Sequence, residues 1–172
     1  MGSRERIWHE LHELFETDDG SLPEFVVTGL EPTALVVGYS RLSAGAHVVT
    51  SAPTVHRRSV GADVSLQSVD DPARLVVLGE LEPFHVVLGG IKARDIALPD
   101  IGVGVFPEEL ILDYRMGPEW TPEAVEGFLH LLAELVSGSP AARVVLEDGV
   151  PRYWVERFER AWIEAELGRR AT

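Results

Sequence analysis

The chain has 172 residues, of which 45% are hydrophobic and 25% charged, which is typical of one globular domain and unlike disordered or collagen-like chains. Its 28 acidic residues outnumber 15 basic ones and give a net charge of −13, a field that repels phosphate backbones and disfavours nucleic-acid binding. The absence of cysteine excludes disulfides, thiolate metal sites and cysteine nucleophiles. We expect a single domain over residues 1–172.

The chain shows no membrane or export signal. It has no run of about 18 apolar residues, the length needed to span a bilayer. Its first residues alternate charged and apolar side chains within single helical turns, unlike a signal peptide. We therefore expect a cytoplasmic protein without membrane contact.

The negative charge is concentrated in two segments. Residues 1–31 hold eight acidic and two basic residues, and residues 102–150 hold nine acidic and two basic residues. The rest of the chain is close to neutral. This distribution indicates two local acidic surfaces in place of a uniform coat.

Three helices are expected from capping residues and apolar spacing. The first runs from about Arg4 to Glu16, with Ser3 as its cap and an apolar stripe at helical spacing. The second begins after the cap Thr121, with Pro122 at its first position, and continues to about residue 137. The third opens at Pro151 and carries aromatic residues on one face.

Short β-branched runs separated by Gly, Pro and Ser predict strands that pair as antiparallel hairpins, because parallel crossovers need a dozen or more linking residues. The expected strands are Phe25–Gly29, Ala34–Tyr39, Ala46–Ser51, Ala62–Ser68, Arg74–Leu78, Phe84–Leu88, Gly102–Phe106, Glu109–Tyr114 and Arg143–Leu146.

Six Val-Val pairs occur in these regions, at 26–27, 36–37, 48–49, 76–77, 86–87 and 144–145. Since adjacent strand residues point to opposite faces, each pair predicts a sheet covered on both sides, by helices, a second sheet or a partner subunit. The expected fold is α+β: a curved antiparallel sheet or two subsheets of about eight or nine short strands, with one N-terminal and two C-terminal helices.

Two segments resemble each other. Residues 26–38 read VVTGLEPTALVVG and residues 76–89 read VVLGELEPFHVVLG. A duplicated hairpin is one interpretation. We favour the other, that two hairpins use similar turn chemistry, since proline is common in turns.

The first helix carries four residues that could ligate a metal: His9, His12, Glu13 and Glu16. Imidazole and carboxylate groups on one helical face can bind zinc. The spacing differs from the metalloprotease motif, and an amphipathic helix places polar residues there in any case. We therefore expect no metal and no cofactor.

Two basic stretches could bind an anion. His56, Arg57 and Arg58, with His47 nearby in sequence, could hold an anionic ligand or an acidic loop, although pairing with the protein's own acids is the simpler interpretation. Lys92 follows two glycines that could form an anion nest, but a hairpin turn explains the glycines as well.

The strand ending in Asp113 and Tyr114 offers the best candidate for catalysis. A buried carboxylate among aromatic rings could act as a general acid or base, with His85 as a further polar group. The alternative is a structural Asp113 that accepts hydrogen bonds. No serine-triad order, nucleophile elbow or paired-carboxylate motif accompanies it.

The sequence favours a non-catalytic acidic domain that binds a protein, for example an inhibitor or immunity-type protein that neutralises a basic partner. The alternative is a small-molecule-binding or hydrolytic domain with its pocket between the sheet and the 121–137 helix. A homodimer that shares a sheet face or edge is also open.

Overall fold

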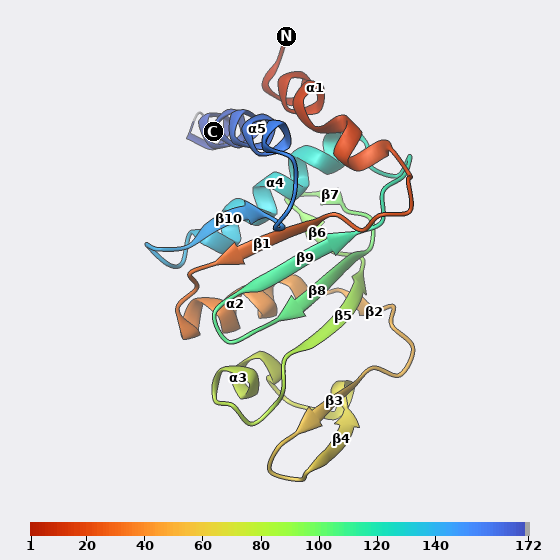
Figure 1. Ribbon diagram of the computed structural model, residues 1–172, viewed down its shortest axis with the longest axis vertical. Helices are drawn as coiled ribbons and strands as arrows, with labels where there is room; N and C mark the ends of the chain where they lie inside the picture. The colour runs from red at the N-terminus through yellow and green to blue at the C-terminus, as the bar shows by residue number, and fades with distance from the viewer. Residues whose placement is uncertain (171–172) are drawn as a thin grey trace.

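The computed structural model describes residues 1–170 and confirms the expected α+β fold. Its centre is an antiparallel sheet of six strands in the order β10-β1-β9-β8-β5-β2 (Figure 1). The strands are β1 (Glu24–Thr28), β2 (His47–Val48), β5 (Phe84–Gly89), β8 (Ile101–Val105), β9 (Leu110–Tyr114) and β10 (Arg143–Leu146). The N-terminal strand β1 therefore lies between two strands from the second half of the chain.

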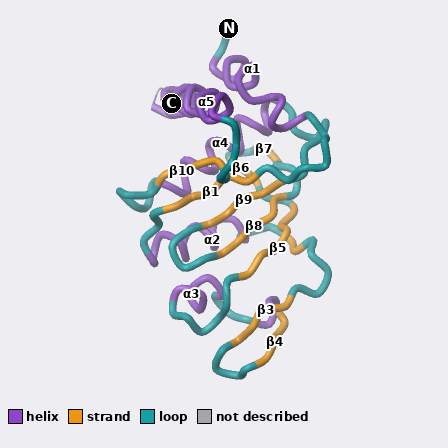
Figure 2. Tube along the Cα trace, viewed as in Figure 1, coloured by secondary structure: helices purple, strands orange, loops and turns teal. Residues whose placement is uncertain are grey.

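Five helices accompany the sheet: α1 (Ser3–Glu16), α2 (Pro32–Ser43), α3 (Pro72–Val77), α4 (Pro122–Val136) and α5 (Arg152–Arg170). In Figures 1 and 2, α2 and α4 lie behind the strands, while α1 and α5 lie together above them; both also contact α4. The three expected helices are present, but Gly2, not Ser3, is the N-cap of α1. Among the described residues, no helix combines the length and apolarity needed to cross a bilayer.

Two small hairpins form separate two-stranded sheets beside the main sheet. One pairs β3 (Thr54–Arg57) with β4 (Ala62–Ser65) and continues into a short 3-10 helix at Leu66–Ser68; with α3 it lies below the main sheet in Figure 1. The other pairs β6 (Lys92–Ala93) with β7 (Ile96–Ala97) and packs against α4.

Two of the expected strands are helices. Ala34–Tyr39 lies within α2 and Arg74–Leu78 overlaps α3. Each helix has a proline in its first turn, where the missing N–H costs nothing. The β-branched valines suggested strands, but burial of α2 follows helical spacing at Leu35, Tyr39 and Leu42, so tertiary packing overrides the local preference.

Among the described residues, neither helices nor a second sheet cover the second face of the main sheet; cover by a partner subunit, the third possibility, stays a prediction. The Val pairs at 36–37 and 76–77 are helical. In the strand β1, Val27 is fully buried toward the helices, whereas Val26 is only partly buried on the opposite face. Helices cover one side of the sheet, and the other side faces outward (Figure 1).

The two similar segments are not duplicated hairpins. In residues 26–38 the first Val pair is in strand β1 and the second in helix α2. In residues 76–89 the order is reversed, with the first pair in helix α3 and the second in strand β5. Matching positions of the two segments therefore have different secondary structures.

Aromatic rings fill the space between the sheet and α4. Phe25 and Tyr114 point from the sheet onto Phe128 of α4, with ring centroids 5.3 and 5.7 Å apart. Phe15 stacks on Tyr114 at 4.7 Å, and Trp120 joins the same cluster. These rings occupy the place where the sequence suggested a pocket.

Candidate functional site

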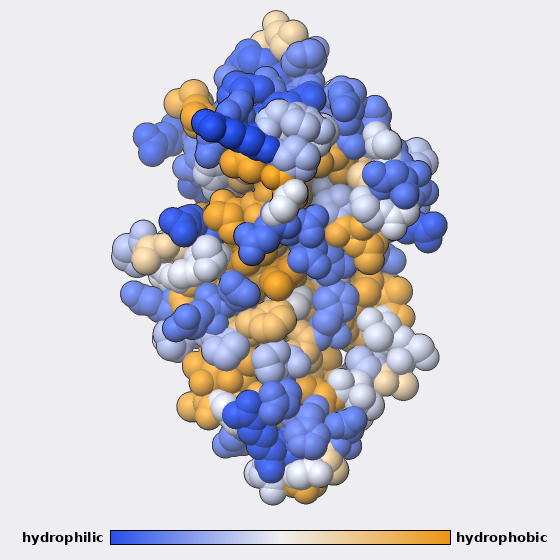
Figure 3. All heavy atoms as spheres, in the orientation of Figure 1, coloured by the Kyte–Doolittle hydropathy of each residue, from blue (hydrophilic) through white to orange (hydrophobic). Residues whose placement is uncertain are grey.

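The outward side of the main sheet, which we call the open face, is built from alternate residues of its strands. Strand alternation places these residues opposite the buried ones. Their neighbours across the sheet follow the register of β10, β1, β9, β8 and β5. Figure 3 shows this side, with hydrophobic residues gathered over the sheet and hydrophilic residues among and around them. The open face comprises Glu24, Val26, Thr28, His85, Val87, Gly102, Gly104, Ile111, Asp113, Arg143 and Val145.

Two glycines of β8 form a floor on the open face. Gly102 pairs with Asp113 across the sheet, and Gly104 pairs with both Ile111 and His85. A β-carbon on Gly102 would collide with the Asp113 carboxylate. The glycines thus let side chains from β5 and β9 meet above β8.

His85 and Asp113 meet above this floor. Nε2 of His85 lies 2.5 Å from Oδ2 of Asp113. The Asp113 side chain is 13% exposed and the His85 side chain 50% exposed. A carboxylate held this way orients an imidazole. The structure therefore brings together two residues that the sequence named separately.

Two shallow hollows lie on the open face. One, of about 570 Å³, runs over β10, β1 and β9 and includes Val26, Ile111 and Val145. The other, of about 330 Å³, lies beside the histidine–aspartate pair and includes Phe106 and Gly104. Three partly buried apolar side chains, Val26, Ile111 and Val145, therefore form the apolar centre of a hollow whose lining is otherwise mostly polar.

Carboxylates surround this apolar centre. Glu24, Glu109, Glu147 and Asp148 line the larger hollow, and Arg143 is the basic residue there. Among the described residues, these four carboxylates form no ion pair within 4 Å. Burial, together with the nearby charge of Glu24, raises the pKa of Glu147. The negative charge at this rim is therefore poorly compensated.

Acids on the helices are better compensated. Glu10 of α1 accepts two hydrogen bonds from Arg160 of α5, which lower its pKa. Arg4 bridges Glu123 and Glu126 of α4. Strand β1, from the first acidic segment, lies between β9 and β10, from the second, so carboxylates of both segments meet at the rim of the open face.

Tyr114, the third catalytic candidate, lies on the other side of the sheet. Its ring is 1% exposed, and its hydroxyl donates to the Leu14 carbonyl at 2.9 Å. Burial raises its pKa well above the usual value. Tyr114 is therefore a core residue, separated from Asp113 by strand alternation.

The candidate anion-binding residues do not form one common site. His56 contacts Asp63, Arg57 lies near Glu80, and Arg58 bonds Glu82, so each basic group has an acidic neighbour. Lys92 is in the β6–β7 hairpin, which is a different place.

His47, which the sequence grouped with this stretch, lies instead on β2. Its ring sits against Gly89, where Asp100 also approaches. It therefore belongs to the far end of the sheet's outward side.

The candidate metal ligands on α1 do not converge on one point. His12 contacts Glu16 at 2.8 Å, and Glu13 lies 3.6 Å from Arg157. His9 lines a separate hollow with Arg160. Within residues 1–170, no three potential metal ligands come together.

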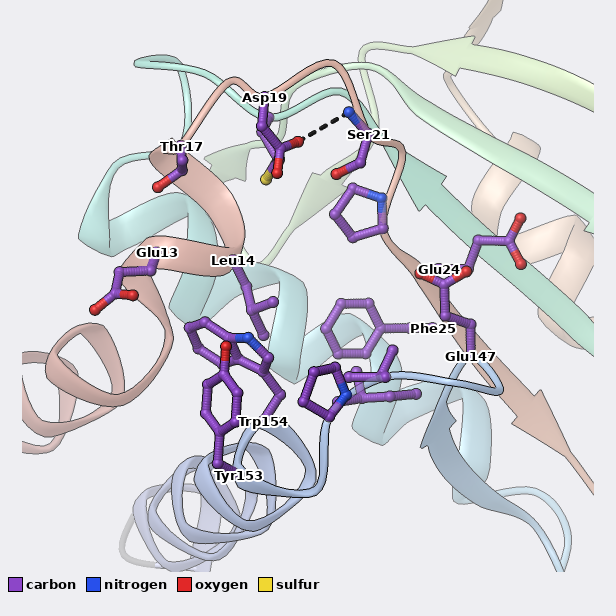
Figure 4. A pocket seen from close by; sticks show the side chains of 15 residues that line it. Glu13, Leu14, Thr17, Asp19, Ser21, Glu24, Phe25, Glu147, Tyr153 and Trp154 are labelled. Carbon is purple, nitrogen blue, oxygen red and sulfur yellow. Dashed lines mark hydrogen bonds between the residues drawn. The ribbon is translucent and has the colours of Figure 1, made fainter.

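A further pocket, of about 330 Å³, lies where the end of α1, the start of β1 and the start of α5 meet (Figure 4). Its lining includes Glu24 and Glu147, which also border the open face. Neither residue stands in a sequence motif, so neither is predicted as a site residue. Their clustering within the two acidic segments was the available signal.

Comparison with known proteins adds no assignment. No protein-family model, no curated protein and no solved structure matches the chain.

Proposed function

We propose that this protein binds a basic partner protein through the open face of its sheet and has no catalytic role. The observation that carries the proposal is the partly buried apolar centre of that face, around Val26, Ile111 and Val145, bordered in the larger hollow by four carboxylates that form no ion pair among the described residues. Exposed apolar patches rimmed by polar residues mark interaction sites.

The charge of the rim favours a partner of opposite sign. Acidic rims speed encounter with basic surfaces and reject acidic ones. Nucleic acid is repelled for the same reason. Covering a basic surface is what an inhibitor or immunity-type protein does, and it needs no catalytic group.

A second copy of the chain fits this face poorly. A twofold dimer places the same patch on both sides of the interface. The Glu24, Glu109 and Glu147 carboxylates of one copy would then meet those of the other, with few basic groups between them. We therefore expect a monomer of 18.9 kDa in light scattering.

The test is capture from native lysate at low and high salt, followed by reconstitution with the purified partner. Ile111→Arg places a positive charge in the centre of the face. Val37→Arg is the control, since Val37 is an exposed valine on α2. We expect a basic partner that binds more weakly at high salt, is lost with Ile111→Arg and is retained with Val37→Arg.

Two results would overturn the proposal. One is the absence of any partner at low salt. The other is a partner whose affinity is the same for the wild type and for Ile111→Arg.

A small-molecule role is the second candidate, favoured by the His85–Asp113 pair beside its hollow. An imidazole oriented by a carboxylate can act as a general base toward water. Ligands found by an NMR binding screen should then lose affinity with His85→Ala. If no compound perturbs His85, this candidate is dropped.

A further inference from the structure

The pocket in Figure 4 has an aromatic and apolar wall. Trp154 and Tyr153 stand on one side, Phe25 lies at the centre, and Leu14 lies nearby. Trp154 is 8% exposed, whereas Tyr153 is 53% exposed. A partly exposed aromatic wall of this kind offers both apolar contact and a ring face to an incoming group.

Trp154 already receives one cation on its ring. The guanidinium carbon of Arg157 lies 4.8 Å from the ring centroid, a distance typical of a cation–π contact. Arg157 itself is not part of the pocket lining. Since Arg157 occupies the Trp154 ring, the accessible ring face of the wall is that of the exposed Tyr153, and tyrosine rings attract cations in the same way.

Carboxylates make up the polar part of the pocket. Glu13, Asp19, Glu24 and Glu147 line it, and no lysine, arginine or histidine does. Asp19 accepts a hydrogen bond from the Ser21 N–H, and Glu13 lies 3.6 Å from Arg157. In Figure 4, Glu24 and Glu147 lie on the side opposite the Trp154 and Tyr153 rings.

The combination fits an organic cation better than a metal ion. No three potential ligands converge within the described range, and much of the lining is hydrocarbon. An alkyl stem with a charged end matches both parts, since methylenes pack on apolar walls while the charged head meets carboxylates.

The position of the pocket indicates where the cation comes from. Glu24 and Glu147 border both this pocket and the larger hollow of the open face. A protein seated on that face could extend one long side chain past these two carboxylates. We propose that the pocket receives an arginine or lysine side chain of the basic partner, an inference that rests on the proposed function.

The raised pKa of Glu147 supports this arrangement. Burial and the charge of Glu24 raise that pKa, because both disfavour the carboxylate. A cation between the two side chains would favour the carboxylate and lower the Glu147 pKa again.

The probes are N-acetyl-arginine amide and N-acetyl-lysine amide, with N-acetyl-citrulline amide as a neutral control of the same shape as the arginine. NMR titration would follow the Trp154 indole N–H and the Glu147 side-chain carboxyl. We expect saturable shifts with a dissociation constant of about 1 mM for such small probes. The citrulline amide should produce no comparable shift.

Two variants locate the binding. Glu147→Gln should weaken binding of the cationic probe about fivefold, the effect of losing roughly 1 kcal/mol of charge attraction. Glu109→Gln removes a carboxylate that lines the open face but not this pocket, so it should leave the probe affinity unchanged.

The outcomes separate this inference from the proposed function. If neither cationic amide binds, or if the citrulline amide binds equally well, the pocket proposal is overturned. The proposed function would still hold in that case if the Ile111→Arg substitution weakens binding of the partner. If the amide binds but Glu147→Gln leaves the affinity for the partner unchanged, the pocket binds a free organic cation, and the proposal that it binds a side chain of the partner is overturned. Loss of both the amide and the partner with Glu147→Gln supports the proposal.

Discussion

The Asp113 carboxylate lies directly over Gly102, its neighbour on the adjacent strand. The absence of a side chain at Gly102 lets this carboxylate lie along the sheet and reach His85, two strands away from its own. The histidine–aspartate pair on the open face thus depends on a residue that takes no part in the contact.

Replacing Gly102 with alanine should break this arrangement. The new β-carbon would collide with the Asp113 carboxylate, and overpacking of this kind costs about 1–3 kcal/mol. We expect a lower free energy of unfolding in urea and a changed His85 ring signal in NMR spectra.

Gly104→Ala is the matched control, since it lies two residues along the same strand. Its β-carbon would lie 3.3 Å from Ile111 and Phe106, a tight but tolerable contact. Equal effects of the two substitutions would contradict the role assigned to Gly102.

Tyr114 is expected to serve stability alone. Tyr114→Phe removes the donor to the part-buried Leu14 carbonyl, and the loss of such a hydrogen bond costs about 1 kcal/mol. The melting temperature should fall by roughly 2–4 °C for each kcal/mol lost. Partner affinity should not change, because Tyr114 faces the core; a specific loss of binding in the folded variant would place it in the site.

Glu147 should lower stability at neutral pH. Its pKa is raised in the folded state, so the folded protein binds more protons than the unfolded chain between the two pKa values. The free energy of unfolding therefore falls as pH rises through that window. Glu147→Gln should be more stable than the wild type at about pH 7, by less than about 1 kcal/mol because of solvent screening.

The difference between Glu147→Gln and the wild type should disappear at about pH 3.5, below the usual glutamate pKa. Asp148→Asn removes the same charge one residue later and controls for net charge. A Glu147→Gln variant less stable than the wild type at neutral pH would show that the carboxylate has a favourable partner.

Glu10 should behave in the opposite way. The hydrogen bond from Arg160 lowers its folded-state pKa, so its contribution to stability is present above the unfolded pKa and is lost as pH falls through the folded pKa. Glu10→Gln should be slightly less stable at neutral pH and equal to the wild type in acid. Thermal melts with Glu159→Gln as control, from α5, would check this; no difference at neutral pH and low salt would refute it.

Elements with local signals could be predicted from the sequence. The start of helix α4 is predicted by the cap Thr121, whose hydroxyl accepts a hydrogen bond from the Ala124 N–H, and by Pro122 at the first helical position. Strand β9 is predicted from its run of β-favouring apolar residues, and its burial alternates as expected for a strand with one buried face. Helix α2 could not be predicted this way, because its valines favour strands and the contact of Gly38 with Leu110 and Leu135 appears only in the folded chain.

The candidate site was predictable only in part. His85 and Asp113 could be named as polar residues of strands, but their meeting depends on β5 and β9 both pairing with β8. The pocket of Figure 4 joins Glu24 to Glu147 and Trp154. Residues that far apart carry no shared local signal, and the two acidic segments predict two separate acidic surfaces instead of one shared site.

Binding through the open face is tested most directly by methyl chemical-shift mapping of the protein with its captured partner. Alternate residues of the same strands serve as internal controls, because strand neighbours point to opposite sides. We expect the methyl signals of Val26, Ile111 and Val145 to shift on binding, while those of Val27 and Leu112, which face the core, shift much less. Perturbations confined to α2, α3 or the β3–β4 hairpin would contradict binding through the open face.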